Sequence, residues 1–209
     1  GDLFEAWIGD DNDDPHDAQV IAALRAAVQR GVPVWIMHGN RDFLLGGRFA
    51  AASGCTLLPD PSMIDLDGEP TLLMHGDTLC IDDVEYQQFR AMVRDPAWQR
   101  QFLARPLAER RAIAANLRET SRQRTGEKAA EIMDVNPQAV IEALRAHGVN
   151  RLIHGHTHRP AVHDLDVDGR PAQRIVLGDW YTQGSVLYAE AGALRLKSLP
   201  PVSSPAVEV

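Results

Sequence analysis

The sequence is poor in cysteine, with two such residues, Cys55 and Cys80, in 209. So few thiols do not make a disulfide framework, which indicates a reducing compartment. No apolar run approaches the ~20 residues of a membrane-spanning helix. Positive charge is also scarce, since 21 Lys and Arg stand against 29 Asp and Glu, for a formal net charge of −8. Such an acidic chain is unsuited to nonspecific nucleic-acid binding, so no nucleic-acid partner is expected.

What remains is the composition of a globular protein. Hydrophobic residues make up 44% of the sequence and charged residues 24%, which allows a sizeable core. The length fits one domain, or one domain with a sub-domain.

Hydrophobic periodicity predicts helices alternating with strands. The helices are expected at 17–29, 43–52, 83–93, 96–121 and from Pro137 to the glycine at 148. Strands are expected at 33–37, 63–66, 71–74 and 151–153, followed by two β-hairpins with turns near 168–169 and 191–192. Residues 10–14 lack the spacing and closing glutamate of a calcium loop, so we expect a solvated acidic loop there.

The predicted strands end in polar loops that combine glycine with His, Asn or Asp. Ligand sites of open α/β sheets lie beyond the carboxyl ends of the strands, so several such loops indicate one shared site. A mixed set of carboxylate, amide and imidazole donors suits two divalent metal ions on either side of a phosphoryl group. The candidate ligands are Asp2, Asn40, His75, His156 and His158.

The strength of this evidence differs among the motifs. Gly1-Asp2 alone is most simply a turn, and His75 alone is more often a hydrogen-bonded histidine than a ligand. The segment 154–158, His-Gly-His-Thr-His, is much stronger, because three histidines in five residues after an apolar strand are rare outside metal sites.

In this order, Gly-Asp at 1–2, Gly-Asn-Arg-Asp at 39–42, His75 and Gly-His-Thr-His at 155–158 resemble the calcineurin-like metallophosphoesterase family. The resemblance implies an α/β fold of two packed mixed β-sheets flanked by helices. It also implies two ions, of manganese, bridged by Asp2, with Asn40, His75 and His156 on one ion and His158 on the other. The family has an Asp-x-His motif before Gly-Asp, and this sequence begins at Gly1, so we expect an N-terminally incomplete chain.

Segments 1–10, 38–44, 74–80, 132–136 and 153–160 resemble, more narrowly, the branch that cleaves UDP-2,3-diacylglucosamine in lipid A synthesis. This implies a hydrolase that yields UMP and 2,3-diacylglucosamine 1-phosphate. It implies a peripheral protein on the cytoplasmic face of the inner membrane of a Gram-negative bacterium. The substrate contacts that it implies are Asn40, Arg41, Asp83, Ser121, Lys128 and His156, with Thr125 where that branch has asparagine.

Arg41 discriminates among reactions. Many phosphoesterases of this class have a histidine at this position, which protonates a departing alkoxide. Arginine cannot do so, because its pKa is above about 12, but it can bind phosphate oxygens. A pyrophosphate substrate needs no such acid, since its leaving group is a phosphate monoester with a second pKa of about 6. The alternative is a surface arginine that merely follows a ligand.

Residues 94–134 are net positive in an otherwise acidic chain and carry an apolar stripe at helical spacing. The pattern fits a lid over an amphiphilic substrate, or equally an ordinary helical hairpin with its apolar face in the core. The resemblance favours a lid that also contacts the membrane surface. We therefore predict a core over 1–93 and 135–199, a helical cap over 94–134 and a flexible tail over 200–209.

Two further functions stay open. One is a phosphodiesterase or phosphatase of the same class with a soluble substrate, against which the apolar, basic cap argues. The other is an inactive metal-binding fragment.

Overall fold

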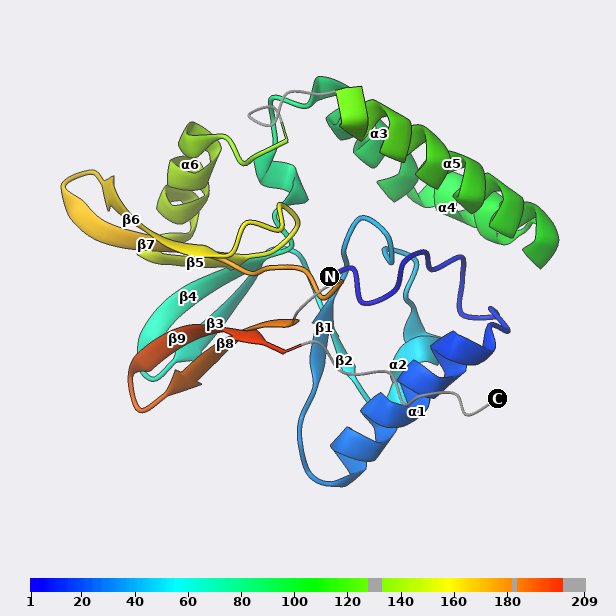
Figure 1. Cartoon of the computed structure of the whole chain (residues 1–209), viewed down its shortest axis with the longest axis horizontal. Coiled ribbons are helices and arrows are strands. Elements are labelled where there is room, and N and C mark those ends of the chain that lie inside the picture. The colour runs from blue at the N-terminus through cyan, green and yellow to red at the C-terminus, as the bar shows by residue number, and fades with distance from the viewer. Residues whose placement is uncertain (128–132, 182–183, 201–209) are drawn as a thin grey trace. The chain divides into compact units, whose positions relative to one another are not determined.

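The computed structural model describes residues 1–127, 133–181 and 184–200, without the side chains of residues 122 and 124–127. The described residues form a mixed α/β protein with six α-helices and nine strands (Figure 1), as predicted. No helix in these segments combines the length and hydropathy of a membrane span. The chain folds into two compact units: unit 1 comprises Gly1–Asp60 and Asp77–Asn136, and unit 2 comprises Pro61–Gly76 and Pro137–Val209.

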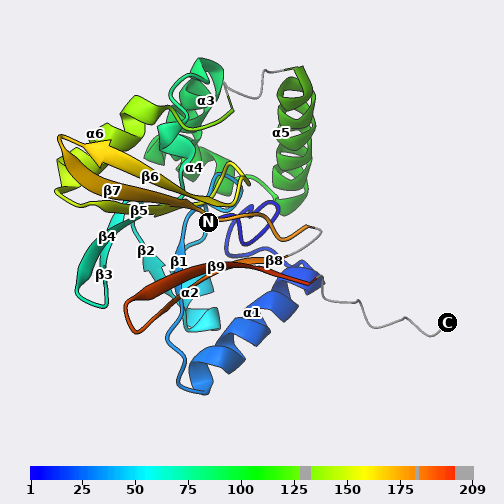
Figure 2. The same ribbon diagram turned by 60° about the vertical axis from the view of Figure 1, so that its left-hand side comes forward.

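Unit 1 is mostly helical. Its elements are α1 (Pro15–Gln29), β1 (Trp35–Met37), α2 (Gly47–Ser53), β2 (Thr56–Leu58), the 3-10 turn η1 (Asp77–Leu79), α3 (Val84–Arg94), α4 (Pro96–Leu103) and α5 (Leu107–Glu127). The two strands pair in parallel, with Ile36 opposite Leu57. Helices α1 and α2 lie side by side in both views (Figures 1 and 2).

An aromatic cluster forms the core of unit 1. Phe4, Trp7 and Phe49 are at most 4% exposed, and their ring centroids lie 4.7–5.9 Å apart. Phe102 of α4 is buried in the same cluster, and Trp98 stacks on it at 5.1 Å. Burial of such side chains stabilises the unit, at about 25 cal/mol per Å² of apolar surface.

Unit 2 contains the main sheet. Its elements are β3 (Ser62–Leu66), β4 (Glu69–Met74), α6 (Pro137–His147), β5 (Arg151–His154), β6 (Ala161–Val167), β7 (Arg170–Val176), β8 (Gly184–Glu190) and β9 (Ala193–Leu199). The five-stranded sheet has the order β3-β4-β5-β7-β6, with parallel pairing of β5 to both neighbours and antiparallel hairpins at both edges. Strands β8 and β9 form a separate antiparallel pair.

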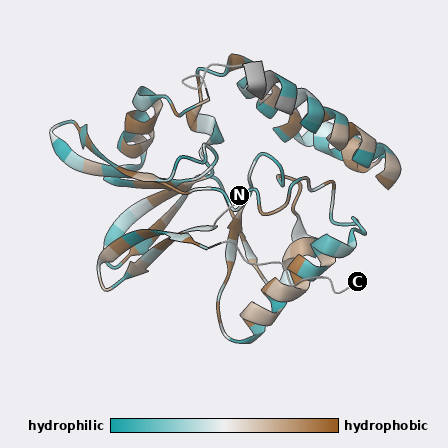
Figure 3. Cartoon of the chain, in the orientation of Figure 1, coloured by the Kyte–Doolittle hydropathy of each residue, from teal (hydrophilic) through white to brown (hydrophobic). Residues whose placement is uncertain are grey.

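Helix α6 packs on the main sheet beside β6. Its residues Val140 and Leu144 are buried, while its other side is hydrophilic (Figure 3). The central strands β4 and β5 carry Leu72 and Leu152, both 0% exposed. Because β4 and β5 are parallel, their carboxyl ends lie at the same edge of the sheet, and the loops that follow them meet there.

The structure corrects several predicted boundaries. The helix expected at 43–52 begins only at Gly47, because the Asp10 carboxylate accepts the N–H groups of Gly46, Arg48 and Phe49 and caps the helix there. The helix expected at 96–121 is two helices, separated at 104–106, where Pro106 cannot donate a backbone hydrogen bond.

Strand β2 was not predicted, because it has three residues and no alternating pattern. The hairpin turns expected near 168–169 and 191–192 are confirmed, and a further turn at 67–68 joins β3 to β4. Residues 201–209 of the predicted tail lie outside the described residues. The division into core and cap stays a prediction.

Candidate functional site

The loop after β1 in unit 1 is organised by one buried carboxylate. Asp42 is 0% exposed and accepts the N–H of Gly39 at 2.6 Å and that of Leu3 at 2.7 Å. It therefore joins the segment that bears Asp2 to the loop that bears Asn40 and Arg41. Two charge-assisted bonds to backbone donors are among the stronger hydrogen bonds in proteins.

Asp2 lies directly against this loop. Its Oδ1 accepts the N–H of Arg41 at 2.8 Å, and a Cβ on Gly39 would lie only 2.1 Å from the same oxygen, so this approach requires glycine. Burial raises the pKa of Asp2 to about 6, although the bond from Arg41 lowers it. A carboxylate that is costly to ionise gains from a bound cation.

The guanidinium of Arg41 lies between two carboxylates of unit 1. Its Nη1 donates to Glu5 at 2.8 Å, and its Nε lies 3.7 Å from Asp2. Arg118 of α5 pairs with the same Glu5 oxygen. Arg41 is therefore a positioned cation beside a predicted ligand, and its role in catalysis stays a prediction.

Helix α3 is anchored to this part of the site. Arg94 donates to the Gly39 carbonyl at 2.9 Å and lies over the Phe43 ring at 5.2 Å. Asp77, which is 0% exposed, accepts hydrogen bonds from Tyr86 at 2.7 Å and Arg90 at 2.8 Å. This network was not predicted, since an arginine in a helix is most simply solvated.

In unit 2 the structure brings two predicted ligands together at the ends of β4 and β5. The rings of His75 and His156 meet edge-on, with centroids 5.0 Å apart. The N–H of Gly155 donates to the His75 carbonyl at 3.0 Å, so the two loops are joined by their backbones. This follows from the parallel pairing of β4 with β5, in which Met74 is opposite His154.

His158 lies in the same loop as His156. Its Nδ1 is 3.6 Å from an oxygen of Asp179, and its ring lies 5.9 Å from that of Tyr181. Asp179 was not predicted, because it stands in a loop after β7 with no motif around it. A carboxylate beside a histidine nitrogen orients the imidazole, which is a frequent arrangement around metal ligands.

Positive φ angles occur at three of the five predicted ligands. Among the described residues, the non-glycine residues with positive φ are Asp67, Asp168 and Ala191 in hairpin turns, and Asp2, His156 and His158 elsewhere. The last three have φ of 60°, 66° and 55°. A left-handed conformation costs about 1–2 kcal/mol per residue and persists where surrounding structure enforces it, commonly at functional sites.

The donors present fit divalent cations. The donors of unit 1 are the Asp2 carboxylate and the Asn40 amide oxygen. Those of unit 2 are the imidazoles of His75, His156 and His158. Each of these donor types binds borderline ions such as manganese, iron or zinc. The division of the ligands between two ions stays a prediction.

The other predicted substrate contacts lie at the start of α3, within α5, or after α5 in the sequence. Asp83 caps α3 by accepting the Tyr86 N–H at 3.1 Å, and Ser121 is exposed on α5. Thr125 has a helical backbone, but its side chain lies outside the described residues, as does all of Lys128.

The acidic loop at 10–14 is ion-paired rather than simply solvated. Arg110 of α5, at 2% exposure, donates to both oxygens of Asp11 and to the Ile8 carbonyl. Arg111 pairs with Asp13. Phe102, which lies within the segment predicted as a cap, is buried in the core of unit 1.

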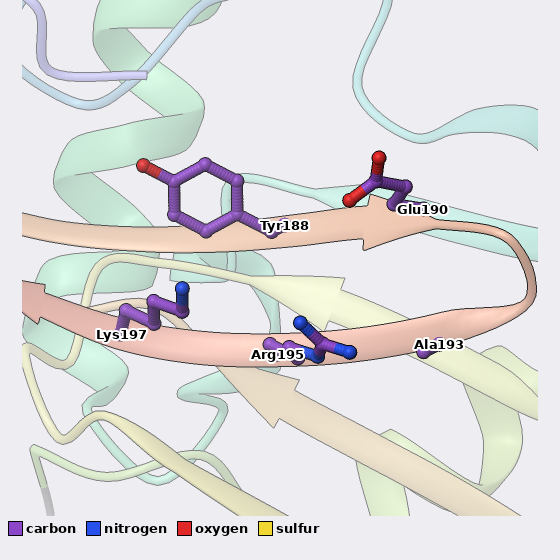
Figure 4. Close-up of a pocket in the computed structure, with 5 residues that line it drawn as sticks. All are labelled: Tyr188, Glu190, Ala193, Arg195 and Lys197. Carbon is purple, nitrogen blue, oxygen red and sulfur yellow. The ribbon is translucent and has the colours of Figure 1, made fainter.

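A hollow on the β8–β9 hairpin is a separate feature of unit 2 (Figure 4). It is lined by Tyr188, Glu190, Ala193, Arg195 and Lys197, with the Lys197 ammonium 5.0 Å from the Tyr188 ring centroid. Its volume of about 50 Å³ is far below the several hundred Å³ of ligand pockets, so it does not hold a nucleotide sugar.

Comparison with known proteins agrees with these motifs. Residues 1–160 match the calcineurin-like phosphoesterase family. The chain is 53% identical over 206 residues to the UDP-2,3-diacylglucosamine hydrolase of Stenotrophomonas maltophilia, covering 95% of this chain and 83% of that protein. It is 54% identical over 198 residues to the protein of that name from Cellvibrio japonicus, covering 95% and 82%. The chain belongs to the calcineurin-like phosphoesterase family.

Proposed function

We propose that this chain hydrolyses the pyrophosphate bond of UDP-2,3-diacylglucosamine, giving UMP and 2,3-diacylglucosamine 1-phosphate for lipid A synthesis. The observation that carries the proposal is the identity of 53–54% over 95% of the chain to proteins named UDP-2,3-diacylglucosamine hydrolase. Residues 1–160, which match the calcineurin-like phosphoesterase family, include every predicted metal ligand. Strain at Asp2, His156 and His158 supports a functional role for the same residues.

The proposed cofactor is a pair of divalent ions, most simply manganese. Asp2 would bridge the ions, Asn40, His75 and His156 would bind one, and His158 would bind the other. When bound, the ions would draw charge from the phosphoryl group and lower the pKa of the attacking water. The proposed fold is the family's sandwich of two mixed sheets with a helical cap over 94–134.

Arg41 would bind the phosphoryl oxygens without donating a proton. Its guanidinium remains charged at every physiological pH, and the contacts to Asp2 and Glu5 hold it beside the proposed bridging ligand. The departing phosphate monoester leaves as an anion, so an arginine that stabilises charge is sufficient. His156 would be both a ligand and a substrate contact, with Asn40, Asp83, Ser121, Thr125 and Lys128 as further contacts.

The lipid part of the substrate implies a membrane. We propose that the chain works on the cytoplasmic face of the inner membrane, held peripherally by its basic helical segment. Arg100 is an exposed cation of this segment, and Leu103 is an exposed apolar side chain at 41%. Cations of this kind are attracted to anionic lipid, and apolar side chains enter the interface.

One observation favours the alternative of a soluble substrate. Phe102 and Trp98, two members of the apolar stripe, pack on the aromatic core of unit 1, which leaves less apolar surface for acyl chains. The two functions differ in what the enzyme does with the acyl groups. A lid for lipid requires that the acylated nucleotide sugar be the better substrate.

The test compares hydrolysis of UDP-2,3-diacylglucosamine with that of UDP-N-acetylglucosamine by the manganese-loaded chain. UMP release is followed by chromatography, and a His156→Ala variant controls for contaminating activity. We expect kcat/KM at least about 100-fold higher for the acylated compound, since its acyl chains add binding energy. Equal rates would favour the soluble-substrate function, and no release from either would exclude both.

A further inference from the structure

Both backbone groups of Gly155, its N–H and its carbonyl, form hydrogen bonds. The N–H of Gly155 donates to the His75 carbonyl at 3.0 Å, and its carbonyl accepts the Thr157 N–H at 2.8 Å. The second bond closes a three-residue turn around His156, whose φ is 66°. A γ-turn with positive φ is the rare, strained form, so the surrounding structure must enforce it.

The side chain of His154 contacts this same carbonyl. Its Nδ1 lies 2.9 Å from the Gly155 oxygen, at hydrogen-bond distance for an Nδ1–H donor. The residue is the last of β5 and 1% exposed. Its backbone is opposite Met74 and Val176, and its carbonyl accepts the Leu177 N–H at 2.8 Å, so the ring extends from a rigid point of the sheet.

The ring also lies against the loop that bears His75. A Cβ on Gly76 would lie 2.8 Å from the His154 Nδ1 and 3.1 Å from the Gly155 oxygen. Gly76 also has a φ of 113°, which other residues rarely adopt. Glycine at this position therefore leaves the space that the His154 ring fills between the two loops.

We propose that His154 is a positioning residue for the metal centre. Its Nδ1–H holds the Gly155 carbonyl, which keeps His156 in its left-handed conformation and sets the place of its imidazole against that of His75. His154 acts through the backbone and is not itself a ligand. The inference rests on the proposed function in one respect, the ligand role of His75 and His156.

The test uses a matched pair of amide variants. In His154→Asn the side-chain amide can lie where Nδ1 lies and can donate to Gly155, whereas in His154→Gln it lies one carbon further out, near the position of Nε2. The readout is the affinity for Mn²⁺, measured by calorimetry or electron paramagnetic resonance, and needs no turnover. A melting curve of each metal-free variant controls for folding.

We expect the Mn²⁺ affinity of His154→Asn to stay within about 3-fold of wild type. That of His154→Gln should fall about 10- to 100-fold, the usual effect of losing a group that orients a ligand. A merely space-filling role predicts the reverse order, because Gln fills the cavity better than Asn. Equal affinities in the two variants, or a better affinity in His154→Gln, would overturn the proposal.

Two controls separate this inference from the proposed function. Ile175→Ala removes a buried side chain of the adjacent strand β7 and should lower the melting temperature without changing Mn²⁺ affinity. His156→Ala should abolish the tight binding. If wild type binds Mn²⁺ but does not hydrolyse the lipid substrate, the proposed function fails and His154 keeps its role. If His156→Ala loses the ion and His154→Gln does not, the positioning role alone fails.

Discussion

The two units hold the loops that bear their predicted ligands by different means. In unit 1 the loops are joined by side-chain carboxylates that accept backbone N–H groups, as Asp42 does from Gly39 and Leu3. In unit 2 the loops follow directly from paired strands, and Gly155 and His75 are joined by a backbone bond. The loops of unit 1 are therefore held by single side chains. The loops of unit 2 are held by a ladder of backbone hydrogen bonds, to which the proposed role of His154 adds one side chain.

This difference has a consequence for substitutions. A backbone ladder survives the loss of one side chain, so ligand substitutions in unit 2 should remove function while the unit stays folded. A carboxylate that organises a loop cannot be removed without leaving buried donors unpaired, so substitutions in unit 1 should affect folding and function together. The following predictions test this contrast, from the largest expected effect to the smallest.

The largest effect is expected from His156→Ala. Loss of a metal ligand should lower kcat/KM about 1000-fold or more, because the ions supply most of the charge stabilisation at phosphorus. The melting temperature should change little, since His156 lies in a loop outside the ladder. His147→Ala, on the exposed side of α6, is the control. More than about a tenth of the wild-type rate in His156→Ala would contradict the ligand assignment.

Arg41→Ala should lower kcat on a pyrophosphate substrate by about 100-fold, the usual effect of removing one group that stabilises transition-state charge. Arg41→His should not restore the rate, although it can speed cleavage of an ester with a poor leaving group. Arg48→Ala, an exposed arginine of α2, is the control. Full activity of Arg41→His on the pyrophosphate would refute the leaving-group argument.

Asp42→Asn tests the dependence of unit 1 on one carboxylate. The amide keeps one acceptor oxygen, so one of the N–H groups of Gly39 and Leu3 loses its partner. Such a loss costs about 1–3 kcal/mol in the free energy of unfolding. We expect an activity loss of about 10-fold as Asp2 and Asn40 shift. Denaturant titration and kinetics together check it, and an unchanged free energy of unfolding would show that the loop is held by other contacts.

Two bidentate arginine–carboxylate pairs sharpen the comparison further. Arg110 with Asp11 is almost fully buried on the arginine side, whereas Arg145 with Asp168 has both side chains about half exposed. Arg110→Met should lower the free energy of unfolding by about 1–3 kcal/mol, because the Ile8 carbonyl also loses its partner. Arg145→Met should not change the melting temperature beyond the range of ordinary surface substitutions.

The Arg110–Asp11 pair predicts that the free energy of unfolding depends on pH. Arg110 holds the pKa of Asp11 below its usual value. The pair therefore stabilises the fold fully above the unfolded pKa of about 4, and this contribution is lost as the pH falls through the lowered folded pKa. The difference in free energy of unfolding between wild type and Arg110→Met should shrink below about pH 4. A constant difference down to pH 2 would exclude the charge of Asp11 as its source.

Much of this protein was predictable because its signals are local. Apolar periodicity placed α1, α3, α6 and β5, and Asp-Gly or Ala-Gly pairs located the hairpin turns. The motif at 154–158 and the loop at 39–42 identified the family, which the match over residues 1–160 confirms. The family can be identified from side-chain type and spacing along the chain, because the motifs place His, Asn and Asp next to glycine.

The tertiary structure alone decided which distant residues meet. Asp42 beside Leu3, Arg94 on the Gly39 carbonyl and Arg110 on the Ile8 carbonyl join positions 39 to 102 residues apart. No local sequence pattern predicts these contacts, since an arginine in an amphipathic helix has the same sequence context whether it is solvated or buried. The same holds for the positive φ of His156, whose turn follows a residue, Gly155, that is bonded to the end of the neighbouring strand at His75.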